Sequence, residues 1–292
     1  MRHLILLMAL PCFGSDLAAR INPIATKCRG DVSLYVKNLD TGETFGIRET
    51  ERVRTASTIK LPILAAVYAA VEENKGKLTD ELTLTEAEKV SGSGVLEGLS
   101  DGVRLPLKDV LHLMIVLSDN TATNMVLEKF PGDLINAYLV KFGLNDTKVL
   151  RKILRGEIAS GHSREGKMQE FQRFGLGVST PKEMVDLLEK LEKGEIVTRE
   201  ASKQMIATLK RQQDNAGIQR RVDFPVASKA GALEKLRSDV GIVYAPWGRI
   251  AMAITVDDLP PSGYKPDNPG LLCIADLSAG LVDGLRPVQG EP

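Results

Sequence analysis

An excess of charge of either sign is missing from this sequence. Its 292 residues include 38 Lys and Arg against 38 Asp and Glu, so the formal net charge is zero. This balance produces no strong field that would draw the whole molecule to nucleic acid or to an acidic membrane. We therefore expect no nucleic-acid partner.

Histidine and cysteine are also scarce, with three of each in the chain. His, Cys and carboxylate residues form no cluster at the spacing of metal ligands, and no Cys-x-x-Cys motif occurs. We therefore expect neither a metal nor a cofactor. His112 and His162 lie in no nucleophile motif, which argues against a Ser-His-Asp triad.

The apolar run at the N-terminus is too short to cross a membrane. Leu4–Pro11 would not span a bilayer, so we expect no stable membrane span. Because Arg2 precedes this run and small residues follow it, residues 1–14 have the pattern of a signal peptide, with Ala19 as the alternative cleavage position. The mature protein would then be exported, either to the periplasm or into the medium.

Export would change both the number of cysteines and their oxidation state. Removal of the N-terminal segment would take away Cys12 and leave Cys28 and Cys273. In an oxidising compartment these two residues can form one disulfide, and two separate buried thiols are the alternative. A bridge between them would join both ends of the fold and close nearly the whole chain.

The rest of the composition is typical of a soluble globular protein, with 43% hydrophobic and 26% charged residues. Strand patterns occupy both ends of the chain, at Asp31–Asn38, Glu43–Arg48, Val226–Lys229, Asp239–Tyr244 and Arg249–Val256. The middle of the chain has helical periodicity, with helices expected at Ile59–Asn74, Leu107–Leu117, Thr121–Phe130, Leu134–Phe142, Pro181–Leu191 and Thr198–Leu209.

This order of elements predicts an α+β fold. Each set of strands is too small to be a sheet of its own, so we expect one five-stranded antiparallel sheet, flanked by terminal helices at residues 16–28 and 271–285. The sheet lobe would consist of residues 15–54 and 212–288, and residues 55–211 would form an all-helical lobe. A pocket is expected where the two lobes meet.

Ser57 and Lys60 stand at the head of a buried-helix pattern, Leu61–Val71. In the first turn of a helix this spacing places the hydroxyl and the amine on one face, within reach of each other. A lysine in an apolar setting can lose its proton near neutral pH and accept the proton of a serine. The pattern predicts Ser57 as nucleophile and Lys60 as its base, although Ser-x-x-Lys is short enough to occur by chance.

Two further motifs have polar side chains that could bind a substrate, one through an amide and one through an anionic group. Ser118 and Asn120 follow the end of a helix, where a hydroxyl can pass on a proton and an amide can bind a substrate, although Ser-Asp-Asn also suits a helix N-cap. Lys229 lies on a strand beside Gly231, where it can hold an anionic group close to a flat backbone. A solvated lysine before a turn is the alternative.

In this order, the three motifs resemble those of class A β-lactamases, and the likeness covers nearly all of the mature sequence. The resemblance implies that Ser57 is acylated by a cyclic or peptide amide, with Lys60 as the base. Ser118 would relay a proton to the leaving nitrogen. The oxyanion hole would consist of the backbone N–H groups of Ser57 and Ala232.

The same resemblance assigns residues that bind the substrate. Asn120 would hold the side-chain amide of the substrate. Lys229 would face the substrate carboxylate, and Gly231, two residues later, belongs to the same substrate-binding strand. The segment Ser91–Val95 resembles the loop that rims the pocket in this family.

The third motif departs from the family pattern. It normally has a hydroxyl residue between the lysine and the glycine, where this chain has Ala230. A hydrogen bond to a substrate carboxylate is thereby lost. Arg237 is the best candidate to replace it, because its planar fork suits a carboxylate.

A second departure concerns the release of the acyl group. Class A enzymes use a glutamate to activate the deacylating water, and that position falls at Ile153 in this chain. The nearby acids Glu157, Glu165 and Glu170 are possible replacements. If none of them reaches the site, acylation survives and hydrolysis stalls.

The resemblance therefore implies an exported serine hydrolase that opens β-lactam rings through an acyl-enzyme. The closest alternative is a penicillin-binding D-alanyl-D-alanine peptidase or esterase without efficient deacylation. A third is a non-catalytic sensor of β-lactams or peptidoglycan. In each case the partner of this protein would be a small β-lactam or a peptidoglycan peptide. The oligomeric state stays open.

Overall fold

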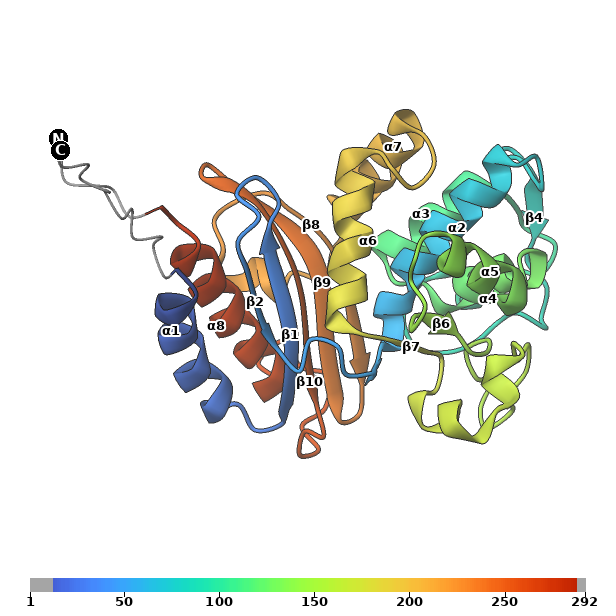
Figure 1. The fold of residues 1–292 in the computed structure, drawn as a ribbon. Helices are drawn as coiled ribbons and strands as arrows, with labels where there is room; N and C mark the ends of the chain where they lie inside the picture. Colours follow the sequence, from blue (N-terminus) through green and yellow to red (C-terminus); the bar gives the residue numbers. More distant parts are fainter. Residues whose placement is uncertain (1–12, 288–292) are drawn as a thin grey trace, which may run out of the picture.

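A computed structural model of the protein describes residues 13–287. At its centre is a five-stranded antiparallel sheet with the strand order β2-β1-β10-β9-β8 (Figure 1). The strands are β1 (Asp31–Asn38), β2 (Thr44–Ile47), β8 (Val226–Leu233), β9 (Leu236–Ala245) and β10 (Gly248–Asp257). The predicted sheet is confirmed, and the two ends of the chain meet in it where β1 pairs with β10.

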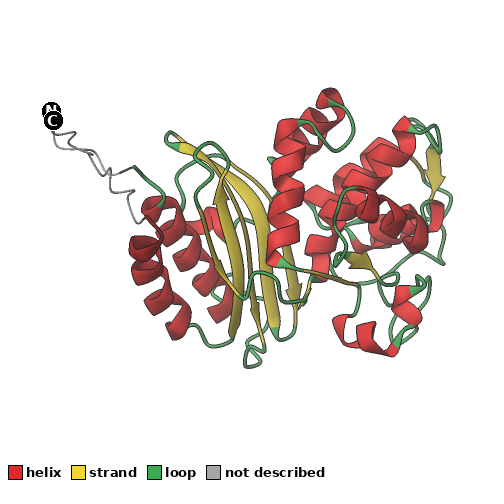
Figure 2. Ribbon diagram, in the orientation of Figure 1, coloured by secondary structure: helices red, strands yellow, loops and turns green. Residues whose placement is uncertain are grey.

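Alternation of side chains along the strands gives this sheet two apolar faces. On β1, Val32, Leu34 and Val36 pack into a cluster with α1 (Phe13–Lys27) and α8 (Pro269–Gly284). These two helices form one layer against the sheet (Figure 2). The predicted terminal helices are therefore confirmed, with small shifts of their ends.

The two terminal helices are also joined covalently. Cys28, directly after α1, forms a disulfide with Cys273 of α8, at a sequence separation of 245 residues. The alternative of two separate thiols is therefore wrong.

The helical part of the molecule lies beyond the other face of the sheet. Its central helix, α2 (Lys60–Glu72), is apolar almost throughout, and 10 of its 13 residues are buried. A helix without a polar face has to be covered on all sides. The covering comes from further predicted helices, which are confirmed as α3 (Leu107–Val116), α4 (Asn120–Lys129), α5 (Gly132–Lys141) and α7 (Arg199–Leu209).

Short elements complete the helical part, which is therefore not all-helical as predicted. Three strands form a small sheet of order β3-β7-β6, and two more form a pair: β3 (Val53–Arg54), β6 (Lys148–Val149), β7 (Gly177–Ser179), β4 (Glu81–Thr83) and β5 (Arg104–Pro106). The 3-10 turns are η1 (Ala56–Ile59), η2 (Leu96–Gly98), η3 (Glu165–Lys167), η4 (Gln169–Phe174) and η5 (Ile218–Arg221). Strands of two or three residues are too short to show alternation in a sequence.

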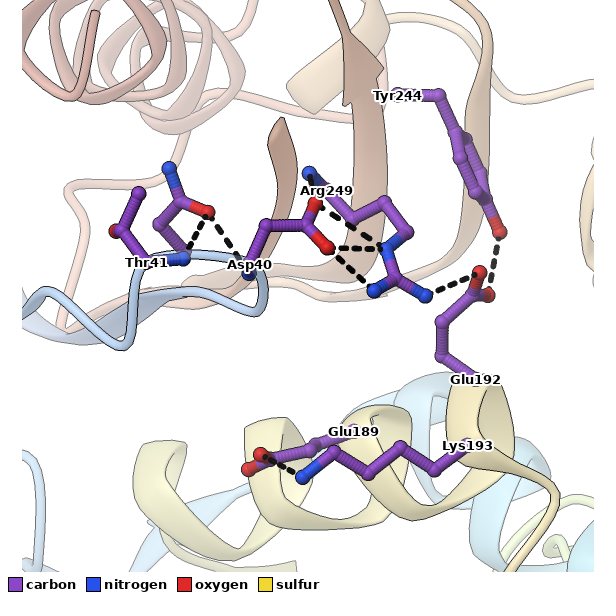
Figure 3. Close-up of polar contacts among 8 residues, drawn as sticks. Asp40, Thr41, Glu189, Glu192, Lys193, Tyr244 and Arg249 are labelled. Carbon is purple, nitrogen blue, oxygen red and sulfur yellow. Dashed lines mark hydrogen bonds and ion pairs between the residues drawn. The ribbon is translucent and has the colours of Figure 1, made fainter. Parts of the chain in front are cut away.

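Helix α6 (Pro181–Lys193) lies between the sheet and the other helices (Figure 1). Its apolar stripe packs across β1, β9 and β10, although the predicted division placed it in the helical lobe. Glu192 of this helix accepts hydrogen bonds from Tyr244 Oη at 2.9 Å and from Arg249 at 3.4 Å. Arg249 also pairs with Asp40 in the hairpin turn, so one guanidinium connects the turn, the sheet and the helix (Figure 3).

The predicted signal peptide, residues 1–14, lies outside the described residues except for Phe13 and Gly14, which begin α1. Between residues 13 and 287 there is no helix with both the length and the apolar character that a membrane crossing requires.

Loss of the disulfide should lower the stability of the fold. The bridge connects residues 245 apart, and removal of a native bridge typically costs about 2 to 5 kcal/mol. We expect a lower urea midpoint for Cys28→Ser, and for the wild type in reductant, when unfolding is followed by circular dichroism. The variant serves as the control, because its midpoint should not respond to reductant. A wild-type midpoint that is also insensitive to reductant would contradict this prediction.

Candidate active site

Ser57 lies in a strained turn that leads into the central helix. It is the second residue of η1, so it precedes the α-helix rather than lying in its first turn as predicted. Ala56 before it has φ of +47°, a conformation that costs a non-glycine residue energy and that occurs often at functional sites. Ala56 and Thr58 are buried, whereas Ser57 is only half-buried. Ser57 is thus the accessible residue of this turn.

Lys60 is fully buried at the start of α2. Its Nζ atom lies 2.7 Å from the carbonyl oxygen of Ser118, 3.2 Å from Ser118 Oγ and 2.9 Å from Asn120 Oδ1. Burial holds the pKa of Lys60 well below its usual value, the charge of Lys229 lowers it further, and Asp119 opposes the shift. The structure therefore brings the first two motifs together.

Lys60 Nζ donates to three oxygen atoms, those of the Ser118 carbonyl, Ser118 Oγ and Asn120 Oδ1. Three donors match an ammonium, whereas an uncharged amine has two donors and one lone pair, which can accept a proton from a hydroxyl. Among the hydrogen bonds of the described residues, none joins Lys60 to Ser57; such bonds often close only when substrate is present.

Asp119 organises the loop that rims the site. It is the N-cap of α4, where its Oδ1 accepts from Ala122 N at 2.8 Å. Its Oδ2 accepts from Val95 N at 2.7 Å and from Leu96 N at 3.0 Å. The tripeptide therefore contains the N-cap of α4, as the alternative reading of Ser-Asp-Asn predicted. The sequence did not predict the hydrogen bonds of Asp119 to the rim loop, because an N-cap pattern predicts only the bond within the helix.

Asn120 connects Lys60 to the rim loop, Ser91–Val95. Its Nδ2 donates to Ser91 O at 3.1 Å, and its backbone N donates to Ser93 O at 2.9 Å. A Cβ at Gly92 would lie 2.7 Å from Asn120 Nδ2, so the loop passes close to this side chain. The amide of Asn120 is thus held in place from both sides, by the loop and by Lys60.

Strand β8 brings the third motif against Ser57. It is an edge strand of the five-stranded sheet. A Cβ at Gly231 would lie 2.9 Å from Ser57 N and 2.8 Å from Thr55 O, so a glycine is needed for this approach. The N–H groups of Ser57 and Ala232 consequently belong to adjoining segments of backbone.

Lys229 is fully buried, so the alternative of a solvated lysine is wrong. Its Nζ donates to the carbonyl oxygen of Ala230 at 2.7 Å. Burial lowers the pKa of Lys229 to about 8, against the opposing influence of Asp239 and Asp214. Its positive charge in turn lowers the pKa of Lys60.

The structure does not bring Arg237 to the site. In register, Arg237 is opposite Ala232, which points away from the face that Gly231 presents to Ser57. A Cβ at Gly270, in the first turn of α8, would lie 3.0 Å from Arg237 Cγ. Its guanidinium donates to three backbone carbonyl groups, those of Leu233, Leu236 and Gly263. Its placement does not support the prediction that Arg237 binds a substrate carboxylate.

Ile153 is tied to α4 by two hydrogen bonds. Its backbone N donates to Asn124 Oδ1 at 2.9 Å, and its carbonyl oxygen accepts from Asn124 Nδ2 at 3.2 Å. Asn124 lies one helical turn after Asn120 and therefore on the same face of α4. The residue held beside this face of the helix is an isoleucine and not an acid.

The three candidate acids lie elsewhere on the loop. Glu165 Oε2 accepts from Asn136 of α5 at 2.9 Å, while Glu157 and Glu170 are exposed. No hydrogen bond of the described residues joins these carboxylates to Ser57, Lys60 or Ser118. Over residues 13–287, His, Cys, Asp and Glu side chains also form no group of three that could hold a metal ion.

Comparison with known proteins agrees with this arrangement. A family model described as the beta-lactamase enzyme family matches residues 16–285. The chain belongs to the class A β-lactamase family. Among solved structures, a β-lactamase from Sphaerobacter thermophilus is 30% identical, with a TM-score of 0.80 over 93% of this chain and 97% of its own. PBP-A is 24% identical, with a TM-score of 0.79 over 92% of this chain and 95% of its own, and a mutant of PBP-A is known as an acyl-enzyme complex with penicillin G.

The curated relatives of this class A chain include proteins of more than one activity. β-Lactamase SME-1 of Serratia marcescens is 26% identical over 187 residues, which are 63% of this chain and 59% of that enzyme. The β-lactamase regulatory protein BlaB of Streptomyces cacaoi is 24% identical over 290 residues, 87% of this chain and 92% of its own. Since one fold serves both, the activity has to be argued from the site.

Replacement of Gly231 by Ala should strongly slow the labelling of Ser57 by a fluorescent penicillin. The new Cβ would meet backbone atoms at 2.8 and 2.9 Å, so β8 would have to move and take the Ala232 N–H with it. Loss of one oxyanion donor costs about 10²- to 10³-fold in rate. Gly98→Ala is the matched control, because a Cβ there has nothing within 4 Å. Equal labelling of the two variants would argue against the close approach of β8.

Proposed function

We propose that this protein is an exported serine hydrolase that is acylated at Ser57 by β-lactams or by peptide amides of peptidoglycan. The observation that carries the proposal is the buried amine of Lys60, with three hydrogen-bonding contacts of 2.7 to 3.2 Å to Ser118 and Asn120. A desolvated lysine beside an accessible serine has the chemistry to activate it. Membership of the class A family supports the same assignment.

Acylation would use Lys60 as the base. The uncharged amine accepts the hydroxyl proton of Ser57 while Oγ attacks the carbonyl carbon of the substrate amide. The N–H groups of Ser57 and Ala232 stabilise the oxyanion that forms. The proton then passes to Ser118 Oγ, 3.2 Å from Lys60 Nζ, and Ser118 protonates the leaving nitrogen. The C–N bond breaks and leaves an ester on Ser57.

Two further groups would position the substrate. Asn120 is held by Lys60 and by the rim loop before any substrate binds, so little freedom is lost when it receives the substrate's side-chain amide. Lys229 supplies a positive charge beside the edge strand. It also favours the uncharged form of Lys60.

Release of the acyl group is the slow step in this proposal. The residue whose backbone is bound by Asn124 is Ile153, and its side chain cannot activate a water molecule. We therefore expect the acyl-enzyme to persist. A persistent ester is the behaviour of a penicillin-binding peptidase or a sensor, and the likeness to PBP-A and BlaB supports this second candidate.

Export belongs to the same proposal. The signal-peptide pattern of residues 1–14 supports it. The Cys28–Cys273 disulfide supports it independently, because such bridges persist in oxidising compartments.

Addition of benzylpenicillin should produce a lasting mass increase on Ser57. The measurement is intact-protein mass spectrometry over time, followed by peptide mapping. Ser57→Ala should show no adduct, and Thr58→Ala, at the buried neighbour, is the matched control. An adduct that clears within seconds would identify an efficient β-lactamase and refute the slow-release step. The absence of any adduct would refute the acylation chemistry.

Ile153→Glu should accelerate the loss of the adduct. The substitution places a carboxylate where Asn124 anchors the loop, and general base catalysis typically contributes about 10²- to 10⁴-fold. Ile158→Glu is the control, since Ile158 is 69% exposed on the same loop. The rate of adduct loss is read from the same mass spectra. An unchanged rate in Ile153→Glu, with acylation intact, would show that this position does not reach the acyl group.

A further inference from the structure

A cavity of about 550 Å³ lies between the C-terminal end of α6, helix α7 and Tyr244 of β9. Its volume is that of a pocket for a small molecule. The cavity is separate from the candidate active site. Gly231 pairs with Ser238 of β9, and Tyr244 lies six residues farther along that strand, which corresponds to about 20 Å. The proposed acylation of Ser57 therefore does not account for this cavity.

One face of α7 supplies most of the cavity wall. The residues that line the cavity from α7 and its C-cap recur at helical spacing, so they lie on one side of the helix: Arg199, Ser202, Lys203, Ile206, Ala207 and Lys210. Arg199 and Lys203 are like charges one turn apart, a spacing that destabilises a helix. An anion bound between the two side chains would remove this repulsion.

The cations of this wall are available to a ligand. Among the ion pairs of the described residues, none includes Arg199, Lys203 or Lys210. Lys210 Nζ lies 3.8 Å from the centroid of the Tyr244 ring. A Cβ at Gly194 would lie 2.7 Å from Arg199 Cγ, so the glycine lets the arginine stem lie against the end of α6. Three positive charges thus border one cavity from α7.

The side of the cavity formed by α6 opposes an anion only weakly. Glu192 is the carboxylate that lines the cavity, and it already accepts hydrogen bonds from Tyr244 Oη at 2.9 Å and from Arg249 at 3.4 Å (Figure 3). Lys193 also lines the cavity and pairs with Glu189 at 2.7 Å. The excess of positive charge in the wall is therefore not cancelled by its acid.

Ser202 provides an independent indication of a ligand. It lines the cavity and is 3% exposed, and its Oγ has no hydrogen-bond partner in the part of the chain that the structure describes. A buried polar atom without a partner is rare in native proteins and requires an explanation. Because no hydrogen bond holds this hydroxyl, rotation about χ1 can turn it toward a group bound in the cavity.

We propose that this cavity binds a phosphate monoester. Arg199, Lys203 and Lys210 would surround the phosphate, and the Tyr244 ring would contact the organic part of the ligand. A phosphate monoester carries close to two negative charges near neutral pH, so it matches three cations better than a single carboxylate does. The arginine fork binds two phosphate oxygens and each lysine acts as a point charge, while the Ser202 hydroxyl donates a further hydrogen bond.

Titration calorimetry of the purified protein with phenyl phosphate tests the proposal. We expect binding to the wild type and weaker binding of benzoate, which has a similar ring and one charge. Lys203→Gln should weaken the binding of phenyl phosphate about tenfold, because a charge-assisted hydrogen bond is lost. Lys77→Gln is the matched control, since it removes the same charge from an exposed lysine outside the cavity. Ser202→Ala should weaken binding less, without a change of charge.

Two further measurements identify the source of the phosphate and separate this inference from the proposed function. Sedimentation with phosphatidylcholine vesicles that contain phosphatidic acid, abolished in Lys203→Gln, would assign the site to a lipid headgroup if phenyl phosphate does not bind. Ser57→Ala should bind phenyl phosphate as the wild type does, so a failure of the acylation chemistry would leave the cavity unaffected.

Three results would overturn the inference. The first is no binding of either phenyl phosphate or phosphatidic acid. The second is binding that both Lys203→Gln and Arg199→Gln leave unchanged. The third is benzoate binding as tight as that of phenyl phosphate, which would exclude selection of a phosphate.

Discussion

The site depends on one interaction, the desolvation of the Lys60 amine. Lys60 begins a helix with almost no polar face, so the packing that covers α2 also removes Lys60 from water. Burial disfavours the ammonium, and the nearby Lys229 adds to that effect. The same packing that stabilises the helical part thus lowers the pKa of Lys60 and favours its uncharged form.

The sheet places a second segment of backbone beside Ser57. Because β8 is an edge strand with a glycine at its closest point, its backbone can approach the turn that carries Ser57. The strand is held in a sheet built from both ends of the chain, and the disulfide fastens the helices that cover its outer face. On the inner face, α6 packs across the sheet and its Glu192 binds Arg249 (Figure 3). The N–H groups of Ser57 and Ala232, the two proposed oxyanion donors, therefore come from segments far apart in sequence.

The departures from the family pattern are confined to the groups that hold and release substrate. By the family resemblance, Ile153 stands where an acid would activate water, and Ala230 stands where a hydroxyl would bind a carboxylate. Ser57, Lys60 and Ser118 are unaffected by these changes. A scaffold can keep its acylation chemistry while the choice of substrate and the fate of the ester differ, because function resides in the site and not in the fold.

The order of the main elements, and the candidates Ser57 for nucleophile and Lys60 for base, follow from the sequence alone. Both depend on neighbouring residues: the periodicity of Leu61–Val71 predicts a helix, and the spacing of Ser57 and Lys60 places them together at its start. Tertiary structure decided the matters that depend on register and packing between distant segments. Arg237 lies on the face of β9 that packs against the start of α8, where its guanidinium binds the backbone carbonyl groups of Leu233, Leu236 and Gly263. Whether Cys28 met Cys273 likewise depended on α1 and α8 packing in one layer, which no local pattern encodes.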